Sequence, residues 1–109
     1  MTIQVHVRAL AAALLLASPA LAPAQQAAVP VPSAAQGKSL YTSFCARCHG
    51  MNMVTTGVSF DLRSFPRDQR ERFERSVTKG LRAMPAWGTT FKPEELESLW
   101  LYVSSSGSS

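Results

Sequence analysis

Five consecutive residues, Cys45-Ala46-Arg47-Cys48-His49, constrain this chain more than any other feature of its sequence. Two thiols three positions apart lie close together on a helical turn, and the next residue places an imidazole beside them. This Cys-x-x-Cys-His spacing is typical of c-type haem attachment, in which both cysteines bond to haem vinyl groups and the histidine binds the iron. We therefore predict one covalently bound haem c, held by Cys45 and Cys48, with His49 as an axial ligand of the iron.

The first 24 residues have the organisation of a secretory signal peptide, and we expect cleavage after Ala24. Residues 1–8 supply positive charge, residues 9–17 are wholly apolar, and small residues and prolines follow. An apolar run this short does not span a bilayer, so we expect no stable membrane anchor. Loss of Arg8 with this segment leaves a net charge of 10 − 7 = +3 without a block of like charges, so we expect no nucleic-acid partner.

Other uses of the cysteine pair explain less of the sequence. A structural zinc site needs about four cysteine or histidine ligands, and only Cys45, Cys48 and His49 remain after His6 leaves with the signal peptide. A thioredoxin-like redox pair needs a β-α-β setting, and no segment alternates as a strand does. A plain disulfide stays open as an alternative, but it accounts neither for His49 nor for the small core.

One small domain is predicted at residues 33–103. Residues 25–32 contain alternating prolines, which favour an extended linker, and the serine-rich residues 104–109 are expected to be a flexible tail. A domain this short buries too little surface to be comfortably stable alone and usually contains a disulfide, a metal or a cofactor. A covalently held haem would act as that core.

Three segments have the apolar spacing of helices, so we predict an all-α fold with three main helices. The first begins with a capping box at residues 33–36, the second spans residues 67–79, and the third begins at Pro93. Their apolar faces carry Gly37, Leu40, Tyr41 and Phe44 in the first, Phe73 and Val77 in the second, and Leu96, Leu99, Trp100 and Val103 in the third.

The motif and its surroundings resemble class I c-type cytochromes over residues 37–103. Besides the attachment motif, the residues that carry the resemblance are Gly37, Tyr41, Gly50, Met84, Pro85, Leu99 and Tyr102. It implies helices around a haem, with Gly37 allowing a close approach to the last helix at Leu99 and Tyr102. Residues 61–88 are similar, more narrowly, to small cytochromes that accompany periplasmic quinoprotein alcohol dehydrogenases.

One feature departs from this family's pattern. The family commonly has a proline shortly after the motif, whose carbonyl accepts the histidine N–H, and residues 50–62 contain none. The carbonyl that orients His49 is therefore left open, although a metal-bound histidine is expected to have a hydrogen-bond acceptor.

Met84 is the predicted sixth ligand of the iron. No second histidine survives processing, and the mature chain has three methionines. Met51 and Met53 follow His49 by two and four residues, at most about 7 and 14 Å of extended chain, which is too little to round a porphyrin without strain. Met84 follows by 35 residues, in a loop that Pro85 stiffens.

Five further residues receive weaker assignments. Phe60 and Leu62 are expected in the haem pocket, and Trp100 is expected in the core. Trp87 either covers the haem or packs as a core residue, and Arg63 either pairs with a haem propionate or is exposed to solvent.

Methionine–histidine ligation leaves no open iron position, which suits electron transfer, so we expect no catalytic residues and no enzyme activity. The resemblance implies a periplasmic carrier of single electrons between redox proteins, with a quinoprotein dehydrogenase as a candidate donor and another cytochrome or a terminal oxidase as acceptor. Two alternatives stay open. One is a dedicated haem subunit of a dehydrogenase complex, and the other is a haem enzyme or sensor with a labile sixth ligand.

Overall fold

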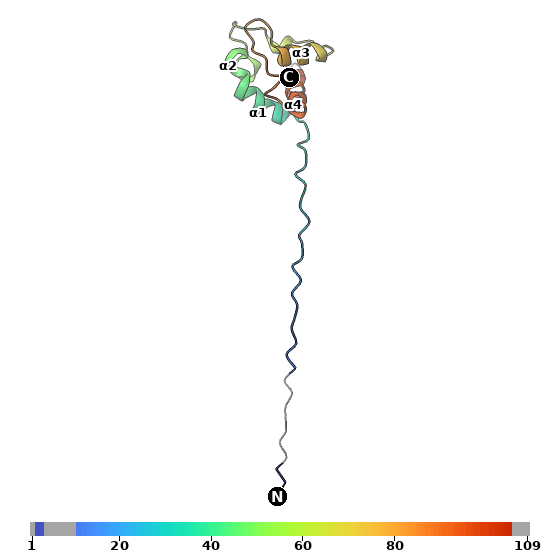
Figure 1. The fold of residues 1–109 in the computed structure, drawn as a ribbon. Coiled ribbons are helices and arrows are strands. Elements are labelled where there is room, and N and C mark those ends of the chain that lie inside the picture. The colour runs from blue at the N-terminus through green and yellow to red at the C-terminus, as the bar shows by residue number, and fades with distance from the viewer. Residues whose placement is uncertain (1, 4–10, 106–109) are drawn as a thin grey trace.

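The computed structural model describes residues 2–3 and 11–105, and in that part the regular structure is helical (Figure 1). In chain order the elements are α1 (Ala34–Phe44), α2 (Ala46–His49), the 3₁₀ turns η1 (Met51–Met53) and η2 (Leu62–Ser64), α3 (Arg70–Lys79) and α4 (Pro93–Ser105). The described residues contain no β-strand, only an isolated bridge between Leu81 and Met84. The predicted all-α fold is confirmed, and α1, α3 and α4 are its three main helices.

Residues 11–32 have no regular secondary structure and extend away from the helices (Figure 1). The signal peptide expected at residues 1–24 and the linker expected at residues 25–32 stay predictions, and residues 1 and 4–10 lie outside the described part. Helix α4 includes Ser104 and Ser105, which we placed in the tail, and residues 106–109 are not described. Among the described residues, no helix has both the length and the apolar character that crossing a membrane requires.

The start of α1 is tied to α4 by hydrogen bonds. Ser33 Oγ accepts from the Gln36 N–H at 3.1 Å, as the capping box predicts. The second half of that box runs instead through Ser98, whose Oγ accepts from the Ser33 N–H at 3.2 Å and lies 3.1 Å from Gln36 Oε1 and 2.9 Å from the Glu94 carbonyl oxygen. Ser98 is fully buried in α4, so the cap of one helix also fixes its position on the other.

Helix α3 begins at Arg70, three residues later than we predicted. Pro66 keeps Phe65 extended, and the chain then makes a turn in which the Gln69 N–H donates to the Pro66 carbonyl at 3.2 Å. The sequence signal for residues 67–69 was charge spacing, which is too weak to overcome this turn.

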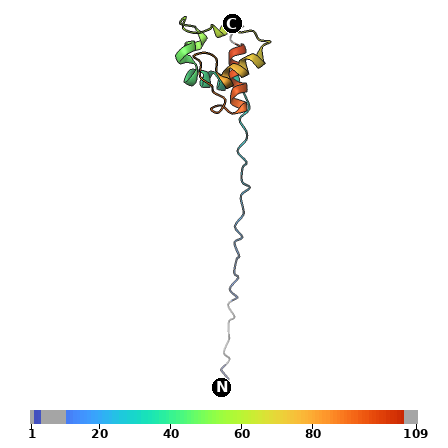
Figure 2. The ribbon, with the colours of Figure 1, turned by 45° about the horizontal axis from the view of Figure 1, so that its top comes forward.

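Helices α1 and α4 pack closely (Figures 1 and 2), and Gly37 makes the approach possible. A Cβ atom at Gly37 would lie 1.8 Å from the Ser98 carbonyl oxygen and 2.8 Å from Tyr102 Cβ. The resemblance placed this approach at Leu99 and Tyr102; the nearest atoms belong to Ser98 and Tyr102.

Gly37→Ala is therefore expected to lower the free energy of unfolding by about 3 kcal/mol, because backbone atoms of α4 would have to move. Chemical denaturation followed by circular dichroism measures this. Ser39→Ala, on the exposed side of the same helix, is the control and should change stability by less than about 0.5 kcal/mol. Equal effects of the two changes would contradict the argument.

The core lies between these helices and is small. Its buried apolar residues are Tyr41, Ala46, Met53, Phe73, Leu99, Trp100 and Val103. Trp100 is in the core, as expected, where it packs against Phe73 with ring centroids 5.3 Å apart. The other side of Phe73 faces a cleft, and that cleft contains the residues of the attachment motif.

Candidate functional site

A cleft runs between the attachment motif and α3. It consists of two adjoining cavities of about 540 and 240 Å³. Both cavities are lined by His49, Phe60, Val77, Leu81, Arg82 and Met84. The larger one is also lined by Cys45 and Cys48, so the four residues we predicted to hold the haem and its iron all border one space.

The attachment motif forms a turn between two helices. Cys45 ends α1, with its N–H donating to the Tyr41 carbonyl at 2.8 Å, and its own carbonyl accepts from the Cys48 and His49 N–H groups. Both thiols are free, so the structure contains no disulfide between them. Burial raises the pKa of the Cys45 thiol to about 11, with a smaller contribution from Cys48, so this cysteine is protonated at neutral pH.

Tyr41 supports the end of the same turn from within the core. Its hydroxyl donates to the Gly50 carbonyl at 2.7 Å, and the side chain is almost fully buried. Burial raises the pKa of this phenol to about 12, so it remains a donor throughout the physiological range. The motif is thus held at both ends, by the end of α1 and by Tyr41.

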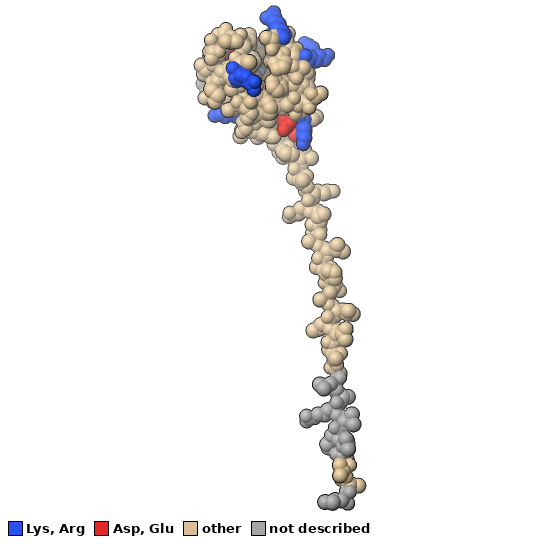
Figure 3. Space-filling view, turned by 60° about the vertical axis from the view of Figure 1, so that its left-hand side comes forward, with Lys and Arg blue, Asp and Glu red and all other residues tan. Residues whose placement is uncertain are grey.

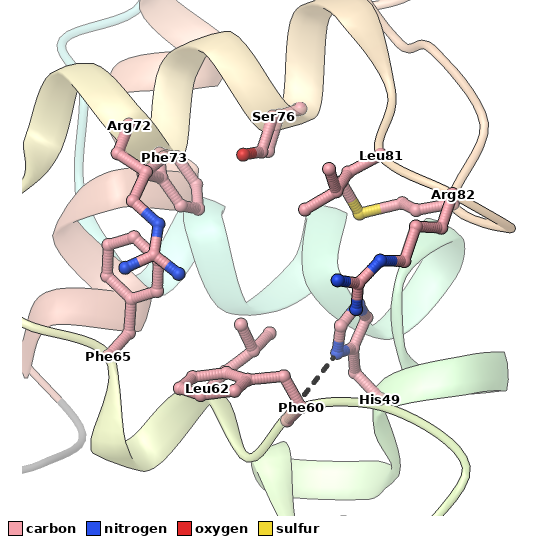
Figure 4. Close-up of a pocket in the computed structure, with 11 residues that line it drawn as sticks. His49, Phe60, Leu62, Phe65, Arg72, Phe73, Ser76, Leu81 and Arg82 are labelled. Carbon is pink, nitrogen blue, oxygen red and sulfur yellow. Dashed lines mark hydrogen bonds between the residues drawn. The ribbon is translucent and has the colours of Figure 1, made fainter.

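The acceptor for His49, left open by the sequence, comes from the segment that follows η1. His49 Nδ1 lies 3.4 Å from the Phe60 carbonyl oxygen (Figure 4) and 3.2 Å from Ser59 Oγ. The Ser59 hydroxyl donates its one proton to the Cys48 carbonyl at 2.7 Å, so toward His49 it acts as an acceptor. This arrangement assigns the proton to Nδ1 and leaves the lone pair of His49 Nε2 available to a metal.

Met84 lies in a loop that is fastened to the end of α3. Gly80 ends the helix with φ of 78°, and a Cβ there would lie 2.8 Å from the Met84 carbonyl oxygen. Leu81 and Met84 exchange two backbone hydrogen bonds of 3.1 and 3.0 Å. Beyond Met84, the Trp87 N–H donates to the Val77 carbonyl at 2.8 Å. Backbone bonds therefore determine where Met84 sits.

The other two methionines of the mature chain are placed differently. Met51 is 58% exposed, Met53 is 0% exposed within the core, and neither lines the cleft. Their positions agree with the expectation that neither methionine is the sixth ligand.

Of the weaker assignments, Phe60 lines both cavities, Leu62 lines the smaller one and Trp87 lines the larger one. Trp87 also packs against Phe44 and Phe91, with ring centroids 5.7 and 5.8 Å away. Arg63 does not line the cleft and pairs with Asp61 at 2.9 Å on the surface, which favours the exposed alternative.

The cleft also contains three polar residues to which the sequence assigned no role, namely Ser59, Arg72 and Ser76. Figure 4 shows Phe73 and Ser76 of α3 on one side of the smaller cavity, with Leu62 and Phe60 on the other. The Arg72 guanidinium lies 5.3 Å from the centre of the Phe65 ring and donates to Gln69 Oε1 at 2.8 Å. The spacing of Arg72 and Ser76 indicates that they share a helix face with the apolar pair 73 and 77, because residues 72 and 76 lie four positions apart beside that pair.

Basic side chains line the cleft and lie around it. Arg47 and Arg82 line the larger cavity and are exposed, and Arg72 and Arg82 line the smaller one. Figure 3 shows Lys and Arg side chains at several places on one face of the helical part, where few Asp and Glu side chains are visible.

The residues of the cleft fit a haem. Aromatic and aliphatic side chains suit a flat apolar macrocycle, two free thiols can form thioethers, and a histidine with an available Nε2 and a methionine can bind iron. Phe60 and Leu81 are 53% and 55% exposed in the polypeptide alone, so such a ligand would bury apolar surface that the protein side chains leave open.

Comparisons with known proteins agree with this fit. A family model described as cytochrome C oxidase, cbb3-type, subunit III, matches residues 32–103. Cytochrome c6 of Microcystis aeruginosa is 36% identical over 72 residues, which cover 62% of this chain and 89% of that protein.

A second group of relatives consists of enzymes much longer than this chain. Quinohemoprotein alcohol dehydrogenase ADH IIB of Pseudomonas putida is 40% identical over 99 residues, which cover 83% of this chain and 14% of the enzyme. A solved structure of quinohemoprotein alcohol dehydrogenase ADHIIG from Pseudomonas putida HK5 superposes with a TM-score of 0.63 at 26% identity, over 84% of this chain and 15% of that one. The similarity therefore concerns a small part of each enzyme.

Proposed function

This chain belongs to the cytochrome c family, whose members carry covalently bound haem c, and from that premise we propose that it is a carrier of single electrons between larger redox proteins. The observation that supports this most is that His49 and Met84 line the same apolar cleft as the free thiols of Cys45 and Cys48. When bound, the haem iron supplies one-electron chemistry between its ferric and ferrous states.

Each residue of the cleft then has a distinct role. Cys45 and Cys48 would hold the macrocycle through thioethers, and His49 Nε2 and the Met84 sulfur would bind the iron. Arg72, whose guanidinium lines the smaller cavity, would neutralise a haem propionate. Ligation by both His49 and Met84 would leave no iron position open to a substrate, and for this reason we assign the chain no catalytic residue.

We infer a periplasmic location and a quinoprotein dehydrogenase as electron donor. The inference rests on the similarity to quinohemoprotein alcohol dehydrogenases, in which a segment like this chain is part of the enzyme. As a separate small protein, this chain would accept the electron by docking at the surface of such a dehydrogenase. The acceptor is another cytochrome or a terminal oxidase.

Absorption spectra of the oxidised and reduced protein test the haem assignment. We expect the narrow bands of a low-spin c-type haem that organic solvent does not extract, together with the weak far-red band of methionine-ligated ferric iron. The reduced protein should not bind carbon monoxide at neutral pH. Rapid binding of carbon monoxide would favour the enzyme or sensor alternative, and co-purification with a dehydrogenase in a fixed ratio would favour the dedicated subunit.

Docking is expected to depend on the basic groups beside the cleft. Arg47 and Arg82 are exposed at the larger cavity, so they favour an acidic partner surface. Because salt screens exposed charges, the rate of electron transfer should fall by on the order of tenfold from low to high ionic strength.

Stopped-flow kinetics of this chain with a reduced acidic partner measure that salt dependence. Arg82→Gln should flatten it. Arg75→Gln removes the same charge from α3 at a position away from the cleft, where Arg75 lies 3.7 Å from Glu71, and should leave it unchanged. A rate that does not vary with salt would remove electrostatic docking from the proposal.

A further inference from the structure

We propose that Ser59 is a positioning residue for His49 and that its hydroxyl helps to set the reduction potential of the iron. The proposal rests on the assignment of His49 as an iron ligand under the proposed function. It goes further because it concerns a side chain that is not an iron ligand, in a segment where the family's usual proline is absent.

The hydrogen bonds around His49 define what Ser59 can do. Ser59 Oγ is the closer of the two acceptors of Nδ1, at 3.2 Å against 3.4 Å for the Phe60 carbonyl. The same oxygen donates to the Cys48 carbonyl at 2.7 Å. One hydroxyl thus connects the second attachment cysteine to the ring of the next residue.

Ser59 is itself held by a short turn. The Thr55 hydroxyl donates to the Ser59 carbonyl at 2.9 Å and accepts from the Gly57 N–H at 3.1 Å. The bond to its carbonyl restrains the backbone of Ser59, and the bond from Oγ to the Cys48 carbonyl orients its side chain. The turn thereby provides the rigid support that a ligand-orienting group needs.

The direction in which Ser59 shifts the reduction potential follows from how strongly His49 donates electrons to the iron. An acceptor on Nδ1–H makes the imidazole a stronger electron donor through Nε2, and a stronger donor stabilises ferric relative to ferrous iron. The 3.4 Å distance to the Phe60 carbonyl is long for a hydrogen bond. Loss of the Ser59 hydroxyl therefore removes the better acceptor, weakens the donor and favours the ferrous state.

Ser59→Ala is the direct test, with spectroelectrochemical titration of the haem-loaded full-length protein as the readout. We expect the ferric–ferrous equilibrium to shift about threefold toward ferrous, which is about 28 mV at 59 mV per tenfold for one electron. Ser59→Thr retains the hydroxyl and should restore the wild-type potential. Ser39→Ala removes an exposed α1 hydroxyl that bonds only within its helix, to the Ala35 carbonyl, and should not change it.

Thr55→Val provides a second test if Ser59→Ala does not mature. It keeps the shape of Thr55 but removes both hydrogen bonds of the turn, and should shift the potential in the same direction by a smaller amount. In the reduced, diamagnetic protein, NMR should also show faster solvent exchange of the His49 Nδ1 proton in Ser59→Ala than in Ser39→Ala.

The outcomes separate this proposal from the function on which it rests. An unchanged or lowered potential in Ser59→Ala, with absorption spectra that still show covalent, low-spin haem, would overturn the role of Ser59 alone. A wild-type protein without covalent haem would overturn the proposed function. A raised potential that Ser59→Thr does not restore would assign the effect to loop structure and not to the hydroxyl.

Discussion

Met84→Ala is expected to lower the reduction potential by on the order of 0.1 V or more, within the range of about 0.8 V over which axial ligands set haem potentials. A thioether is a weak, neutral donor that favours ferrous iron, and its loss leaves the sixth position to water or to an added ligand. The variant should therefore bind carbon monoxide when reduced and lose the far-red band when oxidised. Its loop should persist, because the bonds between Leu81 and Met84 come from the backbone.

Two other methionines serve as controls for this change. Met51→Ala alters an exposed side chain and Met53→Leu a buried one, and neither residue lines the cleft. Both variants should retain the wild-type potential and band. Loss of the far-red band in either variant, with Met84→Ala unaffected, would show that the sixth ligand is misassigned.

Helices α1 and α4 could be predicted from the sequence almost to their ends. Each combines a local start signal with an apolar face of helical spacing: Ser33 caps α1, and Pro93 opens α4 with Glu95 accepting from the Lys92 N–H at 2.8 Å. Helix α3 was less predictable, since its charged residues fit a helix from residue 67 while the turn after Pro66 delays it to Arg70. Local charge pairs are weak and do not decide a helix boundary.

The candidate site likewise contains residues that the sequence predicts and residues that only the folded structure reveals. Cys45, Cys48 and His49 follow from one local motif, and Met84 follows from chain length and loop geometry. Arg72 and Ser76 share a helix face with the apolar residues 73 and 77, whereas Ser59 could not be selected beforehand, because it becomes a cleft residue only when its loop folds against the attachment motif. Nothing local at Ser59 indicates that its hydroxyl lies beside a histidine ten residues earlier.

The second large expected effect concerns the covalent attachment of haem, and it follows from the small size of the core. Cys45→Ala combined with Cys48→Ala should abolish covalent haem and leave a chain that is largely unfolded and degraded. Residues 2–3 and 11–105 include few buried apolar side chains, and the apolar lining of the cleft needs the macrocycle to be covered from water. Neither substitution adds strain, because alanine is smaller than cysteine and readily adopts the helical backbone conformation of both positions.

Haem content, circular dichroism and protein yield measured together test this expectation. Each single variant keeps one thiol, so each should retain haem through one thioether and stay folded. The double variant should show little helical signal unless haem is bound without a covalent link, which acid–acetone extraction would reveal by removing it. A double variant that contains no haem yet remains soluble, helical and cooperatively folded would contradict the role of the cofactor as core. The fold would then rest on the packing of α1 against α4, where Gly37→Ala already provides a separate measurement.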